Sequence, residues 1–199
     1  MLAAAAALIV GASLAAGLGI AAADEAAQAG RAPAGLPGLG GPFALIDQDG
    51  HSRTDAEFRG KLLLVTFGYT DCPDICPLEL QKVSDALALA GPAVAADVVP
   101  LFITIDPVHD TPGRLKRFVH QFGDNIIGLT GAPDSVGQVA HAYRVHAHST
   151  GHDDHQLIDH SDFQYLMGRD GSLLSLIVPN ATAADISKRL QKYAADGQD

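Results

Sequence analysis

The chain contains two cysteines among its 199 residues, Cys72 and Cys76, and both lie in one short segment. An apolar run at 62–67 precedes them and apolar residues at helical spacing follow them, so we expect the pair where a buried strand passes into a helix. At a helix start, unpaired backbone N–H groups and the helix dipole favour thiolate over thiol. Thiolate is both the nucleophile and the metal ligand of cysteine, so the segment predicts a reactive pair rather than a structural disulfide.

Two prolines shape this segment. Pro73 keeps Cys72 in an extended conformation and prevents it from joining a continuous helix with Cys76. Pro77 suits the first helical position, which predicts that Cys76 stands at or next to the N-cap. The three-residue gap between the cysteines weakens the usual interpretation as a Cys-X-X-Cys oxidoreductase without removing it.

From residue 62 to residue 143 the chain alternates between strand-like and helix-like patterns. Short apolar runs predict buried strands at 62–69, 98–105 and 126–129. Apolar residues at helical spacing predict helices at 77–90, from Thr111 to the residue before Gly123, and at 134–143. Such alternation is typical of a parallel sheet with helices on both faces.

The two ends of the folded unit add antiparallel elements. Segments 162–168 and 172–178 flank Arg169-Asp170-Gly171, a strong signal for a hairpin, and 182–185 resembles a capping box that opens a final helix. Residues 43–50 predict a further hairpin at the N-terminal end. The element order is that of thioredoxin. We therefore predict an α/β, thioredoxin-like fold whose central mixed sheet is flanked by helices, with an added N-terminal hairpin and an inserted His-rich loop.

The N-terminal part of the chain predicts export. Residues 2–23 form an Ala/Leu/Gly/Ile/Val run without a charged side chain, long enough to span a bilayer. We predict a signal peptide or N-terminal membrane anchor at 1–23, the alternative being a buried helix of a soluble core. The protein is then expected on the periplasmic side of the inner membrane, anchored or released. The remainder divides into an Ala/Gly/Pro-rich linker at 24–42 that is not expected to pack, a domain at 43–195 and a tail at 196–199.

Composition narrows the class of partner and the kind of metal. Thirteen basic and 23 acidic side chains give a formal charge of −10 without a Lys/Arg cluster, which argues against nucleic acid as a partner. The two methionines, Met1 and Met167, do not supply a thioether-rich metal site. Binding of a soft metal would therefore fall to cysteine and histidine.

The cysteine pair can close as a disulfide or hold one soft ion. Two thiolates leave a coordination position open on Cu(I), and an imidazole suits it. Six of the nine histidines fall between 141 and 160. We single out His160 because it comes immediately before the predicted strand at 163–167. In thioredoxin-like folds, the loop that enters this strand faces the cysteines. Thioredoxins usually have a proline in that loop, whereas this chain has a histidine that can supply an imidazole nitrogen. The predicted metal ligands are therefore Cys72, Cys76 and His160.

Other polar residues near these positions have simpler interpretations. His146, His148, His152 and His155 either form an accessory copper or zinc site or belong to a solvated loop, which the surrounding Ser, Gly and Asp residues favour. Asp71, Asp74 and Asp106 are either charges that support or dock at the site or ordinary turn residues. Four further histidines are expected on the surface: His51, His109, His120 and His141.

Several motifs together resemble the SCO/SenC family. They are the cysteine segment 67–80, the Asp-Pro-X-X-Asp-Thr-Pro stretch within 105–112, and Ile-Asp-His-Ser at 158–161 leading into 165–168. The resemblance covers 43–193 and implies an exported, membrane-tethered, thioredoxin-like protein. By position, the copper ligands of the family correspond to Cys72, Cys76 and His160. His109 and the His-rich segment 146–155 are not part of the family pattern.

The resemblance also implies a role and a partner. Family members assemble the dinuclear copper site of cytochrome c oxidase subunit II, as copper donors, as reductants of its cysteines, or both. The leading hypothesis is therefore a copper metallochaperone, carrying Cu(I) or Cu(II), whose partners are subunit II or another copper-accepting protein and a thiol reductant.

Two alternatives stay open, and whether the protein is an enzyme stays open with them. One is an exported thiol–disulfide oxidoreductase or peroxide reductase that uses Cys72 to attack and Cys76 to resolve. The other is a redox or copper sensor. An oxidising compartment would close the cysteines to a disulfide. Both copper binding and thiol–disulfide exchange therefore require a reductant that keeps them as thiols.

Overall fold

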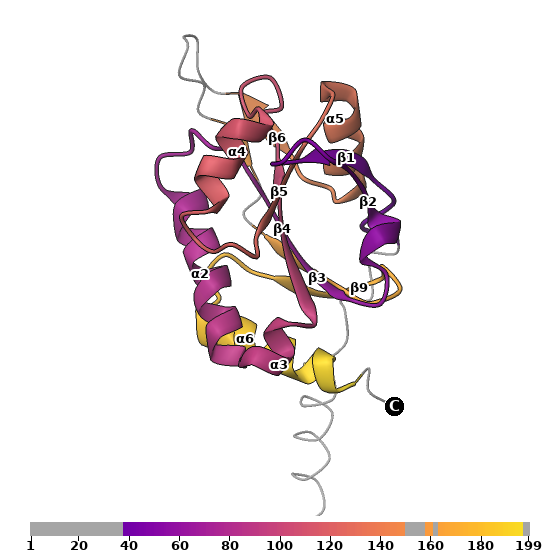
Figure 1. Cartoon of the computed structure of the whole chain (residues 1–199), viewed down its shortest axis with the longest axis vertical. Helices are drawn as coiled ribbons and strands as arrows, with labels where there is room; N and C mark the ends of the chain where they lie inside the picture. Colours follow the sequence, from indigo (N-terminus) through magenta and orange to yellow (C-terminus); the bar gives the residue numbers. More distant parts are fainter. Residues whose placement is uncertain (1–37, 150–157, 161–162, 197–199) are drawn as a thin grey trace, which may run out of the picture. The chain divides into compact units, whose positions relative to one another are not determined.

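The computed structural model of the chain describes residues 38–149, 158–160 and 163–196 (Figure 1), with only the backbone considered at 147–149 and 158–160. The predicted signal or anchor at 1–23, most of the linker, the last three residues, and His152 and His155 lie outside the described residues. Within the described part, no helix is both long enough and apolar enough to cross a membrane.

A seven-stranded mixed sheet forms the centre of the fold, in the order β2-β1-β5-β4-β3-β8-β9. The strands are β1 (Ala44–Asp47), β2 (Ser52–Thr54), β3 (Leu62–Gly68), β4 (Val98–Thr104), β5 (Ile127–Thr130), β8 (Gln164–Met167) and β9 (Leu173–Ile177). Strand β4 runs parallel to β3 and β5, whereas β1, β2, β8 and β9 pair antiparallel with their neighbours. This arrangement confirms the predicted central mixed sheet, the N-terminal hairpin and the C-terminal hairpin.

Helices cover both faces of the sheet (Figure 1). They are α2 (Ile75–Ala90), α3 (Pro92–Ala95), α4 (Pro112–Val119), α5 (Pro133–Ala142) and α6 (Ala183–Ala195), with a 3₁₀ turn η1 at Asp55–Phe58. Alternation along β3 explains the two layers: Leu62 and Leu64 pack with α2 and α6, whereas Leu63 and Val65 pack in the cluster that contains α5. The fold is thioredoxin-like, as predicted.

Helix α2 begins earlier than expected. Its N-cap is Asp74 and its first residue is Ile75, so Cys76 is the second helical residue rather than the N-cap or its neighbour. Pro77 is consequently the third helical residue. Proline is tolerated there because the first four N–H groups of a helix have no partner within it.

Helix α4 ends earlier than expected, at Val119 instead of Phe122. Gln121 and Phe122 donate their N–H groups to the carbonyls three residues earlier, Phe118 and Val119, which tightens the chain into turns. Three short elements were not predicted: η1, α3, and a two-stranded ribbon of β6 (Ala147–Ser149) and β7 (Ile158–His160).

The packed unit starts earlier than residue 43. Leu39 is buried, and the N–H of Gly40 donates to the carbonyl of Ala142 at 2.9 Å. The last residues of the expected linker are therefore part of the fold, because an apolar side chain among the glycines finds a place in the core.

A capping box opens α6 as the sequence predicted. The Thr182 hydroxyl oxygen accepts a hydrogen bond from the Asp185 N–H at 3.2 Å, and the Thr182 N–H donates one to the Asp185 carboxylate at 3.1 Å. Thr182→Ala is expected to lower the free energy of unfolding by about 1 kcal/mol, because it leaves helix donors unpaired. Urea denaturation measures this, with Thr182→Ser as the control that keeps the cap; equal losses in both variants would contradict the capping role.

Candidate functional site

The two cysteines meet at the end of β3, as predicted. Cys72 follows a turn in which its N–H donates to the carbonyl of Tyr69 at 3.3 Å, and Cys76 lies in the first turn of α2. The backbone N–H of Cys76 donates to the Cys72 sulfur at 3.4 Å. A donor aimed at sulfur from a helix start stabilises negative charge there, so the geometry favours a reactive thiolate on Cys72.

The two sulfurs differ in exposure. Cys76 is 2% exposed and belongs to an apolar cluster with Leu80, Phe102 and Phe118, whereas Cys72 is half-buried at the edge of that cluster. Gly68 makes room for the inner sulfur, since a Cβ added at Gly68 would stand 2.7 Å from Cys76 Sγ. A partner molecule therefore reaches Cys72 first.

A buried carboxylate fixes the loop in front of Cys72. Asp110 is 1% exposed and accepts hydrogen bonds from the N–H and the hydroxyl of Thr70 and, at 2.6 Å, from the hydroxyl of Thr104. Burial raises the pKa of Asp110 above its ordinary value of 3.8, although these hydrogen bonds act in the opposite direction. Sequence reasoning missed this role, yet Asp110 is the second aspartate of the Asp-Pro-X-X-Asp-Thr-Pro stretch that carried the family resemblance.

The pKa of Asp110 gives a pH-dependent prediction. A raised pKa means that the folded protein holds the proton more tightly than the unfolded chain, so the free energy of unfolding falls as pH rises from 3.8 through the folded value. Asp110→Asn removes this dependence. The stability of the variant relative to the parent protein should therefore improve across that interval and level off above it.

Urea denaturation of both proteins from about pH 3 to about pH 7 checks this expectation. Because every other titrating group is common to both proteins, the difference isolates Asp110. A stability difference that stays constant with pH would show that the pKa of Asp110 is not raised.

Two of the three aspartates near the cysteine segment form ion pairs, and the third stands at the start of α2. Asp71 pairs with Arg114, and Asp106 pairs with His109 at 2.8 Å. Asp74 is the N-cap of α2 but makes no side-chain capping bond. The expectation of surface histidines is confirmed, because His51, His109, His120 and His141 are all exposed.

The backbone places His160 at the entrance to β8. His160 ends β7, opposite Ala147 of β6, and Gln164 at the start of β8 pairs with Thr66 of β3, two residues before Gly68. The chain after His160 thus joins the sheet near the cysteine end of β3. Among the described side chains, which do not include that of His160, no group of three His, Cys, Asp or Glu residues could hold a metal ion. The three-ligand set stays a prediction, as does an accessory site in the His-rich segment.

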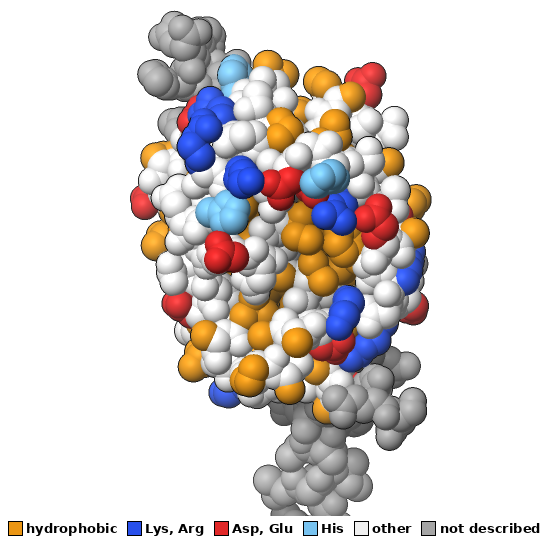
Figure 2. All heavy atoms as spheres, in the orientation of Figure 1, with side chains coloured by type: hydrophobic (Ala, Val, Ile, Leu, Met, Phe, Trp, Pro, Cys, Tyr) orange, Lys and Arg blue, Asp and Glu red, His pale blue; other side chains and the backbone are white. Residues whose placement is uncertain are grey.

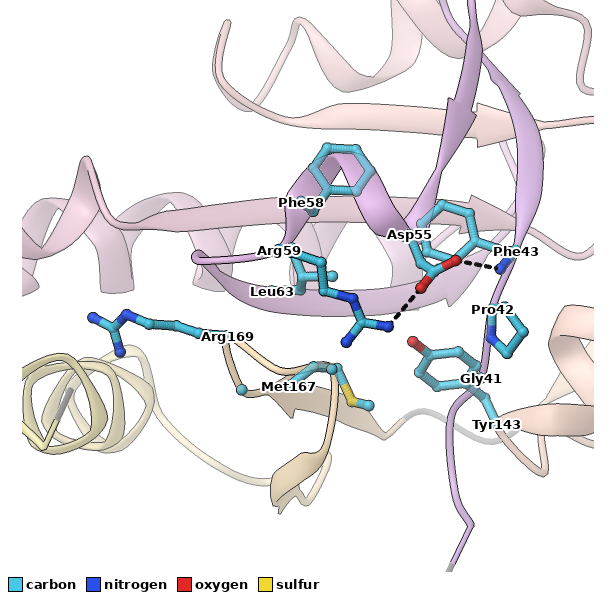
Figure 3. A pocket seen from close by; sticks show the side chains of 12 residues that line it. Gly41, Pro42, Phe43, Asp55, Phe58, Arg59, Leu63, Tyr143, Met167 and Arg169 are labelled. Atoms are coloured by element: carbon cyan, nitrogen blue, oxygen red, sulfur yellow. Dashed lines mark hydrogen bonds and ion pairs between the residues drawn. The ribbon is translucent and has the colours of Figure 1, made fainter.

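A small pocket of about 90 Å³ lies at the other end of β3 (Figure 3). Leu63 and Met167 line it, and Arg59 pairs there with Asp55 at 2.8 Å. The Tyr143 hydroxyl points toward that pair, and burial raises the pKa of Tyr143 to about 12. Since Leu63 and Met167 pair far from the cysteine end of the strand, the pocket is separate from the cysteine site.

Basic side chains on the face shown in Figure 2 lie beside acidic ones rather than in a single patch. Lys116 pairs with Asp49 at 2.7 Å, and Arg53 pairs with the buried carboxylate of Asp47 at 2.8 Å. These two basic side chains are therefore paired with acidic ones.

Sequence comparison identifies relatives. The family described as SCO1/SenC matches residues 31–195. The chain is 38% identical over 163 residues to Protein sco1 of Schizosaccharomyces pombe, covering 80% of this chain and 62% of that protein. It is likewise 38% identical over 163 residues to human Protein SCO1 homolog, mitochondrial, covering 80% of this chain and 54% of that protein. The chain thus spans little more than half the length of these curated relatives.

Solved structures agree. Arabidopsis thaliana ScoI with copper bound matches with a TM-score of 0.75 at 36% identity, covering 79% of this chain and 99% of that one. Bradyrhizobium japonicum ScoI with copper bound matches with a TM-score of 0.72 at 38% identity, covering 78% and 99%. The chain belongs to the SCO1/SenC family.

Proposed function

We propose that the protein is a copper metallochaperone that holds Cu(I) through Cys72, Cys76 and His160. The observation that carries this proposal is the pair of cysteines joined by the 3.4 Å hydrogen bond from the Cys76 N–H to the Cys72 sulfur. That pair occurs in a member of a family whose Arabidopsis and Bradyrhizobium relatives have been solved with copper bound.

The donor set suits copper. Thiolates are soft ligands that select Cu(I), and a single imidazole completes a three-coordinate site without displacing either sulfur. The helix start supplies positive potential that helps both sulfurs to remain deprotonated. Copper is cargo in this proposal, so one accessible sulfur, Cys72, is an advantage because an incoming ligand can replace the sulfurs one at a time.

The proposed receiver is the dinuclear copper site of cytochrome c oxidase subunit II, reached on the periplasmic side of the membrane. The family resemblance supports this choice. The same cysteines can prepare the receiver: Cys72 thiolate attacks a disulfide of subunit II, one receiver thiolate leaves, and Cys76 then attacks the mixed disulfide. The receiver ends with two thiols and this protein with a Cys72–Cys76 disulfide, which an external thiol reductant must reduce.

Copper titration of the reduced protein tests the ligand set. We expect one Cu(I) per chain, with two sulfurs and one imidazole nitrogen in the X-ray absorption spectrum. His160→Ala should lower the affinity by more than about tenfold, since even residues that only support a metal ligand are worth that much. The exposed His141 provides the matched control, because His141→Ala should leave the affinity unchanged. Full affinity in His160→Ala would overturn the three-ligand assignment.

A turnover assay distinguishes a metallochaperone from the main alternative, an enzyme that uses the two cysteines. A thiol–disulfide oxidoreductase or peroxide reductase would reduce its substrate catalytically, and His160→Ala would barely change the rate. A metallochaperone would transfer one copper ion per chain to a reduced soluble domain of subunit II and would lose that transfer in His160→Ala.

A further inference from the structure

A buried polar layer lies one helical turn from Cys76, where α2 packs against the sheet. It consists of Thr66 on β3, Gln164 on β8 and Glu79 on α2, which are 4%, 1% and 7% exposed. The residues on either side of it on this sheet face are apolar, including Leu64 and Leu166. Three polar side chains therefore interrupt an otherwise apolar interface between the helix and the sheet.

Hydrogen bonds tie this layer to three parts of the fold. Gln164 Nε2 donates to Glu79 Oε2 at 2.9 Å, and Lys82 Nζ donates to Glu79 Oε1 at 2.6 Å. Lys82 Nζ also donates to the carbonyl of Pro179, beyond the end of β9, at 2.8 Å. Because bonds to a buried carboxylate are strong and directional, they hold the first turns of α2 at a fixed place on the sheet.

The position of Glu79 connects this layer to the cysteines. Glu79 follows Cys76 by three residues, so both side chains lie on the same face of α2. Thr66 precedes Gly68 by two residues, so both face α2, and Gly68 is the residue against which the Cys76 sulfur packs. Movement of Glu79 relative to β8 would therefore move Cys76 relative to Gly68.

We propose that the Glu79–Gln164 hydrogen bond is a positioning link that keeps Cys76 in the geometry for binding Cu(I) and away from the bonding distance of a disulfide. The inference rests on the proposed function for its copper readout. Glu79 and Gln164 are positioning residues here and do not touch the metal.

The polar layer lowers the free energy of unfolding relative to an apolar core. Thr66 Oγ1 and Gln164 Oε1 find no hydrogen-bond partner among the described residues, and such buried groups cost free energy of folding. An apolar side chain at position 164 would avoid part of that cost. A polar residue that weakens the core beside a reactive pair is better explained by geometry than by stability.

Gln164→Met tests the link, because methionine has nearly the same length and cannot donate to Glu79. It also removes the unpartnered Gln164 Oε1, which offsets part of the stability that is lost with the bond to Glu79. We expect the Cu(I) affinity of the folded protein to fall about tenfold, as for other residues that orient metal ligands. Glu79→Met should lose at least as much, because it also removes the bond from Lys82. The double variant should lose no more than Glu79→Met alone, since Gln164 acts through Glu79.

Ser175→Ala is the matched control. It removes a 2.8 Å hydrogen bond from Arg189 to Ser175 on the neighbouring strand β9, without touching the polar layer. It should lower the unfolding temperature but leave the copper affinity unchanged. Circular dichroism at the temperature of the titration checks that each variant is folded, and Gln164→Met decides the question alone should Glu79→Met fail to fold.

The reduction potential supplies a readout without copper. Equilibration with oxidised and reduced glutathione converts the two thiols to a disulfide, while glutathione disulfide takes up the two electrons and two protons. With the link cut, Cys76 approaches Cys72 more freely, so the equilibrium constant for the disulfide should rise about tenfold, which makes the potential about 30 mV more negative.

The outcomes separate the two proposals. Unchanged affinity and potential in Gln164→Met would overturn the positioning link, as would a loss confined to Glu79→Met, which would indicate an effect of charge. A parent protein that does not bind Cu(I) through two sulfurs would instead overturn the proposed function. The shift in potential would then still test the link.

Discussion

Cys76→Ser and Cys72→Ser are each expected to lower the Cu(I) affinity at least about a hundredfold. Structural zinc sites with four ligands bind with about 10–16 kcal/mol, roughly 3 kcal/mol per ligand, and 3 kcal/mol corresponds to a little more than two orders of magnitude. A hydroxyl is a hard ligand and does not replace the thiolate on Cu(I). Competition with a chromophoric Cu(I) chelator measures both affinities.

The same two variants should differ in stability. Cys76 is 2% exposed among Leu80, Phe102 and Phe118, so serine there places a hydroxyl in an apolar cluster. Burying an unpaired hydroxyl costs about 1–3 kcal/mol, whereas the half-buried position of Cys72 leaves the hydroxyl near water. Thermal unfolding of the metal-free proteins should therefore show a lower midpoint for Cys76→Ser only. An affinity within about tenfold of the parent in either variant would exclude that cysteine as a ligand.

Gly68→Ala is expected to damage both stability and copper binding, although it adds a single methyl group. The new Cβ would stand 2.7 Å from Cys76 Sγ and 2.8 Å from the Phe102 ring, closer than such atoms can approach. Phe102 is completely buried and cannot yield easily, so the sulfur and the first turn of α2 must move. Overpacking of this kind lowers the free energy of unfolding by about 1–3 kcal/mol.

Gly137→Ala provides the opposite expectation within the same protein. Gly137 lies on an exposed part of α5, and a Cβ there meets nothing within 4 Å. Alanine should stabilise the helix by roughly 0.5–1 kcal/mol and leave the copper affinity unchanged. Urea denaturation and copper titration of both variants check the pair of predictions; a Gly68→Ala protein as stable as the parent would show that the contact between β3 and Cys76 is not tight.

The strands, helices and hairpins that depend on neighbouring residues could be predicted from the sequence. Apolar periodicity placed β3, β4 and the interior of α2, and the hairpin signal at Arg169-Asp170-Gly171 placed β8 beside β9. The meeting of Cys72 with Cys76 follows from the same local order, because a strand that turns directly into a helix brings both residues to one edge.

Features that depend on distant contacts were not predicted. Glu79 and Gln164 are 85 residues apart, and Thr70 and Asp110 are 40 apart, so no local pattern signals either hydrogen bond. The start of α2 was placed too late because Pro77 is compatible with several positions in a first helical turn. The packing of Leu39 was missed because a single leucine among glycines carries no periodicity.

The entry point of the chain affects how the protein can be tethered. A Cβ at Gly40 would contact Met167, and Met167 pairs with Leu63 at the beginning of β3, whereas the cysteines follow the end of that seven-residue strand. At about 3.3 Å per residue, the length of the strand separates the entry point from the sulfurs by roughly 20 Å. A membrane tether attached at this entry point would hold the end of the fold where β3 begins. The other end, which carries the thiols, would stay accessible to a neighbouring protein.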